Sequence, residues 1–377
     1  MPHVLMNAYL LGGQADYRSA GIHNVIHRLL QHLPQQAPPE ENWRFTACVG
    51  AQAEVAYPGV TLRRSAWDTR APLRRIVWEQ AVQPWALTRQ PHDLYHALAF
   101  AAPLLRPARP LVVTVYDLSF VRYPERLSRA RRIYLQALTP LSCRQARCVL
   151  AISESTKRDL VELLGLPAEK IIVTPLGYDE ATMRPQSAEA VAAFRRAKGL
   201  PERFWLFVGT IEPRKNLPFL LQAYAMLKRD ERLPLLLGGG GGWGLQAVQE
   251  AIMRYNLSDE VRLLGFLPAG ELPLWYASAE AFLYPSVFEG FGLPVLEAMA
   301  CGTPTLTTNV SSLPEVAADA ALCLPPDSLD AWTAGLRLAL NEDWRALARL
   351  RGLAQARRFS WQQTARLTLE SYRQALG

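Results

Sequence analysis

Short apolar runs alternate with longer segments of helical periodicity along most of this chain. The first run, His3–Leu11, ends at Gly12-Gly13, and apolar residues from Gly21 to Leu33 then recur at helical spacing. A strand, a turn and an amphipathic helix in repeated succession are typical of a parallel sheet with helices on both faces. In the first half of the chain, further strands are predicted at Arg44–Val49, Asp93–Ala97, Leu111–Tyr116 and Cys148–Ile152.

The same pattern occurs again in the second half of the chain. Strands are predicted there at Phe204–Val208, Leu233–Leu237, Val261–Leu264, Ala281–Tyr284 and Pro304–Thr307. The chain has 377 residues, more than the roughly 250–300 at which a single core stops growing. We therefore predict an α/β fold of two doubly wound, Rossmann-like parallel-sheet domains that face each other across a cleft.

The segment from Pro175 to about Pro201 is the predicted linker, because it combines prolines with the polar helical piece Ala188–Lys198. The predicted domains are residues 1–185 and 186–358. A C-terminal helix is predicted over residues 359–377, and it is long enough to cross back to the first domain. Ligands of such sheets bind beyond the carboxyl ends of the strands, so substrates are expected between the two domains.

The composition is that of a soluble globular protein, with 50% hydrophobic and 20% charged residues. The N-terminus has no basic stretch before a long apolar run, and no segment approaches a membrane-spanning length, so we expect a cytoplasmic protein. The five cysteines form no Cys-x-x-Cys pair and have no histidines at metal spacing. They are predicted to be reduced, and no metal site is expected.

The formal charge of +7 is concentrated in the first half of the chain. Residues 1–180 hold 21 Lys and Arg against 15 Asp and Glu, much of the excess in Arg63–Arg75 and Arg106–Arg147. These stretches suit a peripheral contact with anionic lipid or an acceptor that carries a pyrophosphate; the alternative is a solvated, arginine-rich helical face. No nucleic-acid-binding module is recognisable, so nucleic acid is not an expected partner.

The segment 284–304 is the strongest candidate site. A strand ends at Tyr284, Glu289 follows in a loop with Gly290 and Gly292, and Pro294 suits the first turn of a helix that contains Glu297. Glycines let a ligand approach the main chain, and a helix N-terminus favours a phosphate. Two carboxylates suit sugar hydroxyls. On these grounds alone, a glycine-rich loop with acidic residues near a helix N-terminus is an equally good interpretation.

A second candidate site follows the strand Trp205–Val208. There Arg214 and Lys215 stand side by side before a predicted helix. Arginine binds phosphate through two hydrogen bonds and lysine as a point charge, so the pair is suited to a diphosphate. Cations fixed there would stabilise the charge that grows on a leaving diphosphate. The alternative is a solvated charged turn.

These two segments together resemble the donor-binding half of the large retaining glycosyltransferase family four, which has the GT-B fold. The resemblance rests on Val208-Gly209-Thr210, Glu212-Pro213-Arg214-Lys215-Asn216 and Phe288 to Pro304. Val113 to Phe120 and Phe359-Ser360-Trp361 also resemble members that act in bacterial surface-polysaccharide assembly, many of them mannosyl- or rhamnosyltransferases.

The resemblance implies a role for each matching residue. The N-terminal domain would bind the acceptor, and the second domain a nucleotide-diphosphate sugar. Glu289 would contact the donor sugar, Glu297 the ribose, and Arg214 with Lys215 the diphosphate. Asp117 would face the sugar near its anomeric carbon. The remaining implied donor contacts are Gly12, Gly13, Gly209, Phe266, Leu267, Gly290, Phe291, Gly292 and Leu293.

One position departs from the family pattern. Relatives commonly have histidine directly before the aspartate, where this chain has Tyr116. A tyrosine with a pKa near 10 is a poor base at neutral pH, so proton transfer is assigned to Asp117. Alternatively, as the family implies for a retaining reaction, the departing phosphate oxygen accepts the proton of the acceptor hydroxyl.

Several other functions compete with this interpretation. Gly239 to Gly244 matches a dinucleotide-binding motif, but Asp259 and Glu260 precede the next strand instead of ending it, which disfavours a dehydrogenase. No Asp-x-Asp triplet is present to hold a metal-bound diphosphate, so a metal-independent reaction without a cofactor is expected. A pyridoxal phosphorylase would need a lysine that forms a Schiff base. Only Lys215 lies in a suggestive position, and phosphate binding already accounts for it. A non-catalytic sugar-nucleotide-binding subunit stays open because of Tyr116.

The resemblance therefore predicts a retaining hexosyltransferase. GDP-mannose is the favoured donor and a UDP-sugar the alternative. The predicted acceptor is a hydroxyl of a glycan or a lipid-linked sugar. The predicted location is the cytoplasm, with a peripheral position at the inner face of the cytoplasmic membrane as an option.

Overall fold

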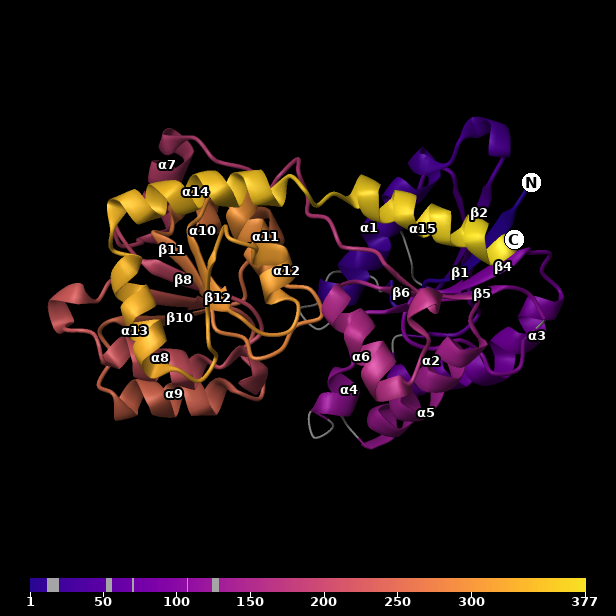
Figure 1. Ribbon diagram of the computed structural model, residues 1–377, viewed down its shortest axis with the longest axis horizontal. Coiled ribbons are helices and arrows are strands. Elements are labelled where there is room, and N and C mark those ends of the chain that lie inside the picture. The colour runs from indigo at the N-terminus through magenta and orange to yellow at the C-terminus, as the bar shows by residue number, and fades with distance from the viewer. Residues whose placement is uncertain (12–19, 52–55, 70, 107, 124–128) are drawn as a thin grey trace. The chain divides into compact units, whose positions relative to one another are not determined.

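The computed structural model describes residues 1–11, 20–51, 56–69, 71–106, 108–123 and 129–377. The chain divides into two units (Figure 1). Residues Met1–Gly177 and Trp361–Gly377 form the first unit, and Tyr178–Ser360 form the second. Each unit contains one parallel sheet with helices on both faces, which confirms the predicted α/β class with two Rossmann-like domains.

The first unit has a seven-stranded sheet in the order β3-β2-β1-β4-β5-β6-β7, and every neighbouring pair is parallel. Its strands are β1 His3–Asn7, β2 Arg44–Val49, β3 Val60–Arg64, β4 Leu94–Ala97, β5 Leu111–Val115, β6 Cys148–Ala151 and β7 Ile171–Val173. The strand order reverses between β1 and β4. Ligands bind at such a reversal in doubly wound sheets.

Helices cover both faces of this sheet (Figure 1). On one face α1 Ala20–Gln36 packs against the last helix, α15 Trp361–Leu376, which also contacts β4, β5 and β6. The remaining helical segments are η1 Pro39–Glu41, α2 Pro72–Val77, the π-helical η2 Trp78–Val82, α3 Gln83–Thr88, α4 Ser119–Arg122, α5 Arg129–Gln145, α6 Glu154–Leu164 and η4 Ala168–Lys170. Among these, α2, α3 and α5 lie on the opposite face from α1 and α15 (Figure 1).

Polar side chains inside the first unit fix α15 to the sheet. The Tyr372 hydroxyl on α15 is hydrogen-bonded to His96 Nδ1 at 2.7 Å, and His96 Nε2 to Thr114 Oγ1 at 2.8 Å. His96 and Tyr372 are fully buried. The closing helix is therefore part of the core of the first unit, although the rest of that unit ends at Gly177.

The second unit has a six-stranded parallel sheet in the order β10-β9-β8-β11-β12-β13. Its strands are β8 Trp205–Val208, β9 Leu235–Gly238, β10 Val261–Gly265, β11 Ala281–Tyr284, β12 Thr305–Thr308 and β13 Leu322–Leu324. The order reverses between β8 and β11. Arg214 and Lys215 follow β8, and Glu289 follows β11, so the topology brings the two predicted site segments together at the reversal.

The helices of the second unit also form two layers (Figure 1). One layer contains α8 Leu217–Ala225, α9 Leu245–Arg254 and α13 Leu329–Leu338. The other contains α7 Ala188–Lys198, α10 Leu272–Ser278, α11 Leu293–Ala300, α12 Leu313–Ala317 and α14 Glu342–Ala356. Short turns of helix are η5 Pro213–Lys215, η6 Arg229–Glu231 and η7 Ala269–Glu271.

The sequence pattern predicts ten strands of the two sheets but not β3, β7 and β13. All three lie at the edge of a sheet. Central strands such as β5 and β11 are buried along their whole length and so appear as unbroken apolar runs. In β3, by contrast, Arg63 and Arg64 are exposed, so an edge strand gives a weaker signal.

The helices and cysteines add two observations. Within the described ranges, no helix combines the length and the apolar character needed to cross a bilayer. The five cysteines are free, four of them buried and Cys323 half-buried.

Candidate functional site

The segment after β8 presents two adjacent cations at the carboxyl end of the sheet. Glu212 precedes the 3-10 turn η5, and Asn216 ends it in the left-handed region at φ 56°, which redirects the chain into α8. Asparagine is one of the few residues that adopt this conformation readily. Arg214 and Lys215 therefore project from one short, fixed turn.

The backbone joins this turn to the segment after β11. The Val287 amide donates to the Arg214 carbonyl at 2.8 Å, and the Ser286 hydroxyl donates to the same carbonyl at 3.0 Å. In return, Arg214 Nη1 donates to the Phe288 carbonyl at 3.0 Å. These three hydrogen bonds join the two predicted site segments to each other.

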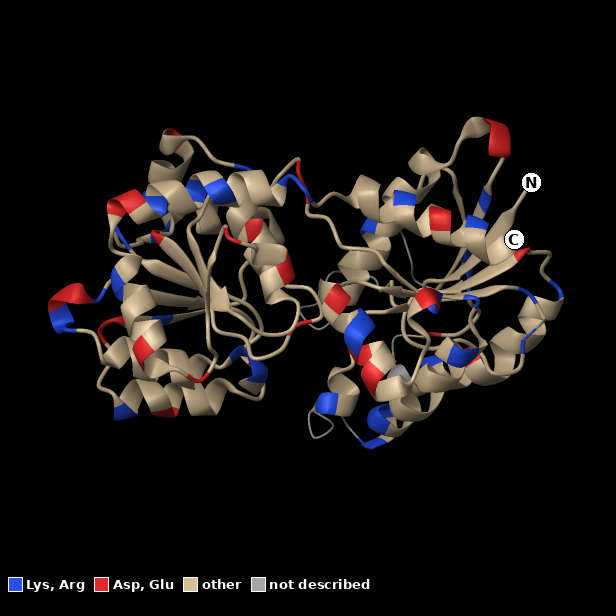
Figure 2. Ribbon diagram, in the orientation of Figure 1, with Lys and Arg blue, Asp and Glu red and all other residues tan. Residues whose placement is uncertain are grey.

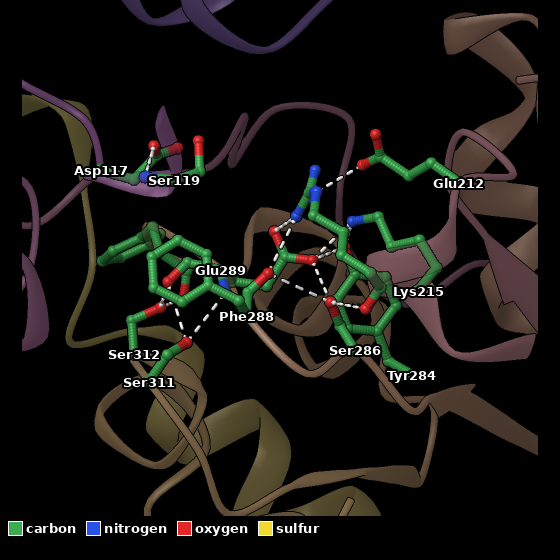
Figure 3. A network of polar contacts seen from close by, with 12 residues as sticks. Asp117, Ser119, Glu212, Lys215, Tyr284, Ser286, Phe288, Glu289, Ser311 and Ser312 are labelled. Carbon is green, nitrogen blue, oxygen red and sulfur yellow. Dashed lines mark hydrogen bonds and ion pairs between the residues drawn. The ribbon is translucent and has the colours of Figure 1, made fainter. Parts of the chain in front are cut away.

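Glu289 lies between the two cations (Figure 3). Its Oε2 is 2.5 Å from Arg214 Nη1, and its Oε1 is 2.5 Å from Lys215 Nζ. Arg214 Nε also pairs with Glu212. The four side chains carry two positive and two negative charges, so the cations are already balanced by protein carboxylates. The sequence analysis did not predict that Arg214 and Lys215 both contact Glu289.

Neutral hydroxyls complete the surroundings of Glu289. Its Oε1 accepts hydrogen bonds from the Ser286 hydroxyl at 2.6 Å and from the Tyr284 hydroxyl at 3.0 Å. The Lys215 ammonium also contacts the Tyr284 hydroxyl and lies 4.6 Å from the centre of its ring. Lys215, Tyr284, Ser286 and Glu289 are all buried. A buried charge needs such partners, and here the carboxylate has several.

The charges shift the pKa values of this cluster in directions that keep Glu289 ionised. Burial alone would raise the pKa of Glu289, but the positive charges of Arg214 and Lys215 outweigh it and lower that pKa. Burial and the neighbouring Arg214 lower the pKa of Lys215, although Glu289 opposes them. Burial alone would lower the pKa of Arg214, but the carboxylates of Glu289 and Glu212 outweigh burial and raise that pKa.

Two serines that the sequence analysis did not single out hold the backbone at Glu289 (Figure 3). Ser311 Oγ accepts from the Glu289 amide at 2.8 Å and is also hydrogen-bonded to the Glu289 carbonyl at 2.9 Å. Ser312 Oγ donates to the carbonyls of Glu289 and Phe291 at 2.9 and 2.8 Å. Both serines come after the carboxyl end of β12. Polar residues at that position are a sequence signal that could have identified them.

The helix α11 begins where the sequence predicts it. Gly292 precedes the helix with φ 109°, a conformation that favours glycine, and an added Cβ there would lie 2.8 Å from the Leu313 side chain. Among the described residues, the backbone amides of Phe291, Gly292 and Leu293 have no hydrogen-bond partner. Unpaired amides at a helix N-terminus suit an anion.

Glu297 lies one turn inside α11 in a different environment from Glu289. Its Oε2 accepts a hydrogen bond from the Tyr276 hydroxyl at 3.1 Å. Burial raises the pKa of Glu297 to about 7, and the nearby Asp179 adds to the shift. The two acidic residues of this segment thus differ: the pKa of Glu289 is lowered, and that of Glu297 is raised to about 7.

The glycine-rich loop after β9 packs backbone to backbone against the loop after β8. An added Cβ at Gly239 would lie 1.9 Å from the Gly209 carbonyl oxygen, and one at Gly242 would lie 2.4 Å from that of Ile211. These glycines are therefore required by the contact of two loops. This packing explains the glycine run without a dinucleotide and removes the main argument for a dehydrogenase.

Three of the remaining predicted donor contacts lie among the described residues. Phe266 is exposed and Leu267 buried, and both border a groove of about 280 Å³ that Trp275 also lines. Gly290 lies in the loop between Glu289 and the start of α11. Gly12 and Gly13 lie outside the described residues.

Tyr116 and Asp117 follow β5 in the first unit. The Tyr116 hydroxyl is buried and donates to the Leu98 carbonyl at 2.9 Å, and burial raises the pKa of Tyr116 far above neutrality. Tyr116 thus stays protonated at neutral pH, and its hydroxyl is engaged with the backbone. Asp117 is half-buried, and its Oδ1 accepts from the Ser119 amide at 2.8 Å (Figure 3).

Metal-binding side chains are dispersed in the part of the chain that the structure describes. Among the residues that the structure describes, no three His, Cys, Asp or Glu side chains gather closely enough to hold an ion.

Comparison with known families assigns both units. Residues 20–182 match the model described as Glycosyltransferase Family 4, and residues 191–357 match the model described as Glycosyl transferases group 1. O-antigen chain mannosyltransferase B of Escherichia coli is 36% identical over 294 residues, which cover 77% of each chain. The chain belongs to glycosyltransferase family four. Its predicted membership of this family is therefore confirmed.

Two further relatives of this glycosyltransferase extend the comparison. The serotype-specific mannosyltransferase WbdA of Escherichia coli is 32% identical over 256 residues, which are 65% of this chain but only 31% of WbdA. Sucrose-phosphate synthase of Thermosynechococcus elongatus has a similar fold, with a TM-score of 0.78 at 20% identity over 99% of both chains. The glycosyltransferase thus shares its fold with enzymes far from it in sequence.

Proposed function

We propose that this glycosyltransferase moves a mannosyl group from GDP-mannose to a hydroxyl of a glycan or a lipid-linked sugar, with retention of configuration. Two relatives in the comparison are mannosyltransferases, one of them for the O-antigen chain, which supports mannose and a polysaccharide product. A UDP-sugar is the alternative donor. The observation that carries the proposal is the buried cluster of Arg214, Lys215 and Glu289 at the strand-order reversal of the second unit.

The proposed donor site divides its work between two kinds of group. Arg214 and Lys215, together with the amides of Phe291 to Leu293, bind the diphosphate. Glu289 accepts hydrogen bonds from the sugar hydroxyls, and Glu297 accepts one from the ribose. Gly209 and Gly290 leave room for the ligand, and Phe266 and Leu267 border the base.

The proposed chemistry depends on charge stabilisation and needs no cofactor or metal. The bond between the anomeric carbon and the diphosphate breaks, and negative charge grows on the leaving group. Arg214 and Lys215 stabilise that charge more in the transition state than in the ground state. The acceptor hydroxyl forms the new bond and gives its proton to the departing phosphate oxygen, or to Asp117 if that carboxylate faces the sugar.

The proposed location is the cytoplasm, where nucleotide sugars would be the donors. Residues 1–185 would bind the acceptor and residues 186–358 the donor. We also propose that the protein contacts the inner face of the cytoplasmic membrane, because a lipid-linked acceptor is held there and the first half of the chain carries the positive charge.

Incubation of the purified protein with a panel of nucleotide sugars tests the proposal. Nucleoside diphosphate release is measured with and without a panel of glycan and lipid-linked acceptors, and the anomeric configuration of the product is determined. GDP-mannose should give the fastest acceptor-dependent release, and the product should keep the α configuration of the donor.

The same experiment separates the enzyme from a non-catalytic sugar-nucleotide-binding subunit. Tyr116, which takes no part in proton transfer at neutral pH, keeps that second function under consideration. Binding of nucleotide sugars without turnover on any acceptor would support the non-catalytic subunit. Turnover with another sugar would overturn the mannose assignment alone.

A further inference from the structure

The helical segment between β3 and β4 carries apolar side chains on its outer side. The backbone dihedrals stay helical from α2 through η2 into α3. The exposed apolar residues recur at every fourth position: Leu73, Val77, Ala81 and Trp85. Leu73 is 67% and Trp85 61% exposed. A π-turn holds more residues than the 3.6 of an α-helical turn, so η2 helps to keep residues four apart in line.

The helix α5 repeats this arrangement on the same face of the sheet (Figure 1). Ile133 is 63% exposed, and Leu141 on the same helix is also exposed. In both helical segments the inward positions are buried, as Leu87 and Leu135 are. The outward apolar residues therefore contribute little to the core.

Hydrogen bonds join the two helical segments to each other and to the loop that contains Leu104 and Leu105. The Tyr134 hydroxyl on α5 donates to Glu79 Oε2 on η2 at 3.1 Å, and the Leu104 amide donates to Gln80 Oε1 at 3.2 Å. The loop places Leu105, which is 78% exposed, beside these segments. We use the name apolar face for the outward residues Leu73, Val77, Ala81, Trp85, Leu104, Leu105, Ile133 and Leu141.

The part of the chain that carries the apolar face is rich in arginine. Residues 71–147 contain twelve arginines and only four acidic residues, a surplus of eight in a chain whose net formal charge is +7. Glu79 is buried, and Asp93 accepts a hydrogen bond from the His3 amide at the amino end of the strands. Figure 2 shows basic residues on α2 and α5. Exposed arginines such as Arg74 and Arg89 therefore accompany the outward apolar residues.

We propose that the apolar face is the site at which the first unit docks on an anionic lipid bilayer. Apolar side chains enter the boundary between headgroups and acyl chains, and arginines pair with lipid phosphates. The Arg89 guanidinium lies 3.4 Å from the centre of the exposed Trp85 ring, a pair that combines a cation with an aromatic group of the kind favoured at membrane interfaces. Anionic charge on the partner explains the arginine surplus, which a neutral protein partner does not.

This inference deepens the proposed contact with the membrane and names the surface that makes it. Its test measures binding and no turnover, so its failure and the failure of the proposed transferase activity are distinguishable. Vesicles of phosphatidylcholine alone, and of phosphatidylcholine with phosphatidylglycerol, are sedimented with the full-length protein at low and high salt. The protein should sediment with the anionic vesicles, and less so at high salt.

Two sets of substitutions identify the docking surface. The triple variant Leu73→Gln, Val77→Gln, Trp85→Gln should lower the partition coefficient on anionic vesicles at least about tenfold, because three apolar side chains leave water on binding. Arg74→Gln with Arg89→Gln should lower it about fivefold for each arginine removed. The matched control is Met253→Gln, Leu347→Gln, Leu350→Gln in the second unit, whose side chains are exposed to a similar degree.

Equal loss of binding in the control triple variant would overturn the assignment to this face. Indifference to anionic lipid, or to both variants of the first unit, would also overturn the proposal. Light scattering of the parent protein and the triple variant tests the alternative occupant. A dimer that the triple variant dissociates, together with no binding to vesicles, would make the apolar face an interface between two copies of this chain.

Discussion

Arg214 of the candidate site and the arginines of the apolar face have opposite surroundings. In the second unit, Arg214 pairs with Glu289 and Glu212 within a network that is closed by hydroxyls and backbone carbonyls. In the first unit, Arg74 and Arg89 are exposed, and neither forms an ion pair with another described residue. Their neighbours are exposed apolar side chains. The position of a cation relative to carboxylates and to apolar surface therefore distinguishes the proposed donor site from the proposed docking surface.

The two units also differ at the carboxyl ends of their central strands. In the second unit, the residues after β8 and β11 are charged and paired with one another. After β5 in the first unit, Tyr116 turns inward to the Leu98 carbonyl and leaves Asp117 as the polar group of that segment. Under the proposed mechanism, the second unit would supply most of the charge stabilisation.

The sharpest way to break this comparison is to remove one charge of the cluster. Lys215→Ala should lower kcat/KM by about 10²–10³, the range found when one preorganised donor of a transition-state charge is removed. Nucleoside diphosphate binding, measured by titration calorimetry, should weaken with it. Glu289→Gln should also lower turnover but should not weaken diphosphate binding, since it removes the carboxylate charge that both cations share.

The control for this pair is Lys228→Ala, an exposed lysine of the same unit. It should leave both quantities unchanged. If Lys215→Ala keeps the parent rate, or if Glu289→Gln weakens diphosphate binding as much as Lys215→Ala, the division of roles in the cluster is wrong.

A pH series distinguishes the two carboxylates of the second unit. The folded-state pKa of Glu297, about 7, lies above the ordinary value of roughly 4.3 for glutamate. Between these values the folded protein holds the proton that the unfolded chain has lost, so this group lowers stability as pH rises. Replacement by Gln should therefore stabilise the protein at about pH 8 relative to about pH 5, by on the order of 2 kcal/mol given the partial exposure of Glu297.

The same titration has a functional readout. An ionised Glu297 accepts a hydroxyl hydrogen bond better than a protonated one, so the KM for the donor should fall as pH rises through about 7. Glu297→Gln should remove that dependence, while Glu289→Gln should keep it. Denaturant unfolding and initial rates at each pH measure the two effects, and parallel pH profiles of parent and Glu297→Gln would contradict the assignment.

The smallest expected effect concerns the helix that closes the first unit. Tyr372→Phe leaves His96 Nδ1 buried without its partner and should cost about 1–3 kcal/mol of unfolding free energy. Because α15 belongs to the first unit, the loss should appear in the unfolding of that unit and leave the ligand affinity of the second unit unchanged. A loss of diphosphate binding in Tyr372→Phe would show that the two units depend on each other more than their separate cores suggest.

Much of this protein can be read from its sequence because local patterns reflect local physics. Buried central strands give unbroken apolar runs, Gly292 and Pro294 mark the start of α11, and Arg214-Lys215 and Glu289 follow strands. These signals determine the fold class, the family and the position of the two candidate site segments. The sequence analysis missed three of the four edge strands: β7 and β13 have only three residues each, and β3 carries exposed polar side chains.

Only the tertiary structure decided how these residues meet. Strand order brings β8 beside β11 and so places Glu289 between Arg214 and Lys215, a pairing across 74 residues that no local pattern records. It also sets opposite pKa shifts on Glu289 and Glu297, since burial and neighbouring charge depend on packing. Likewise, the sequence determined that the first half is rich in arginine, and packing decided that Leu73, Val77 and Trp85 remain outside the core beside it.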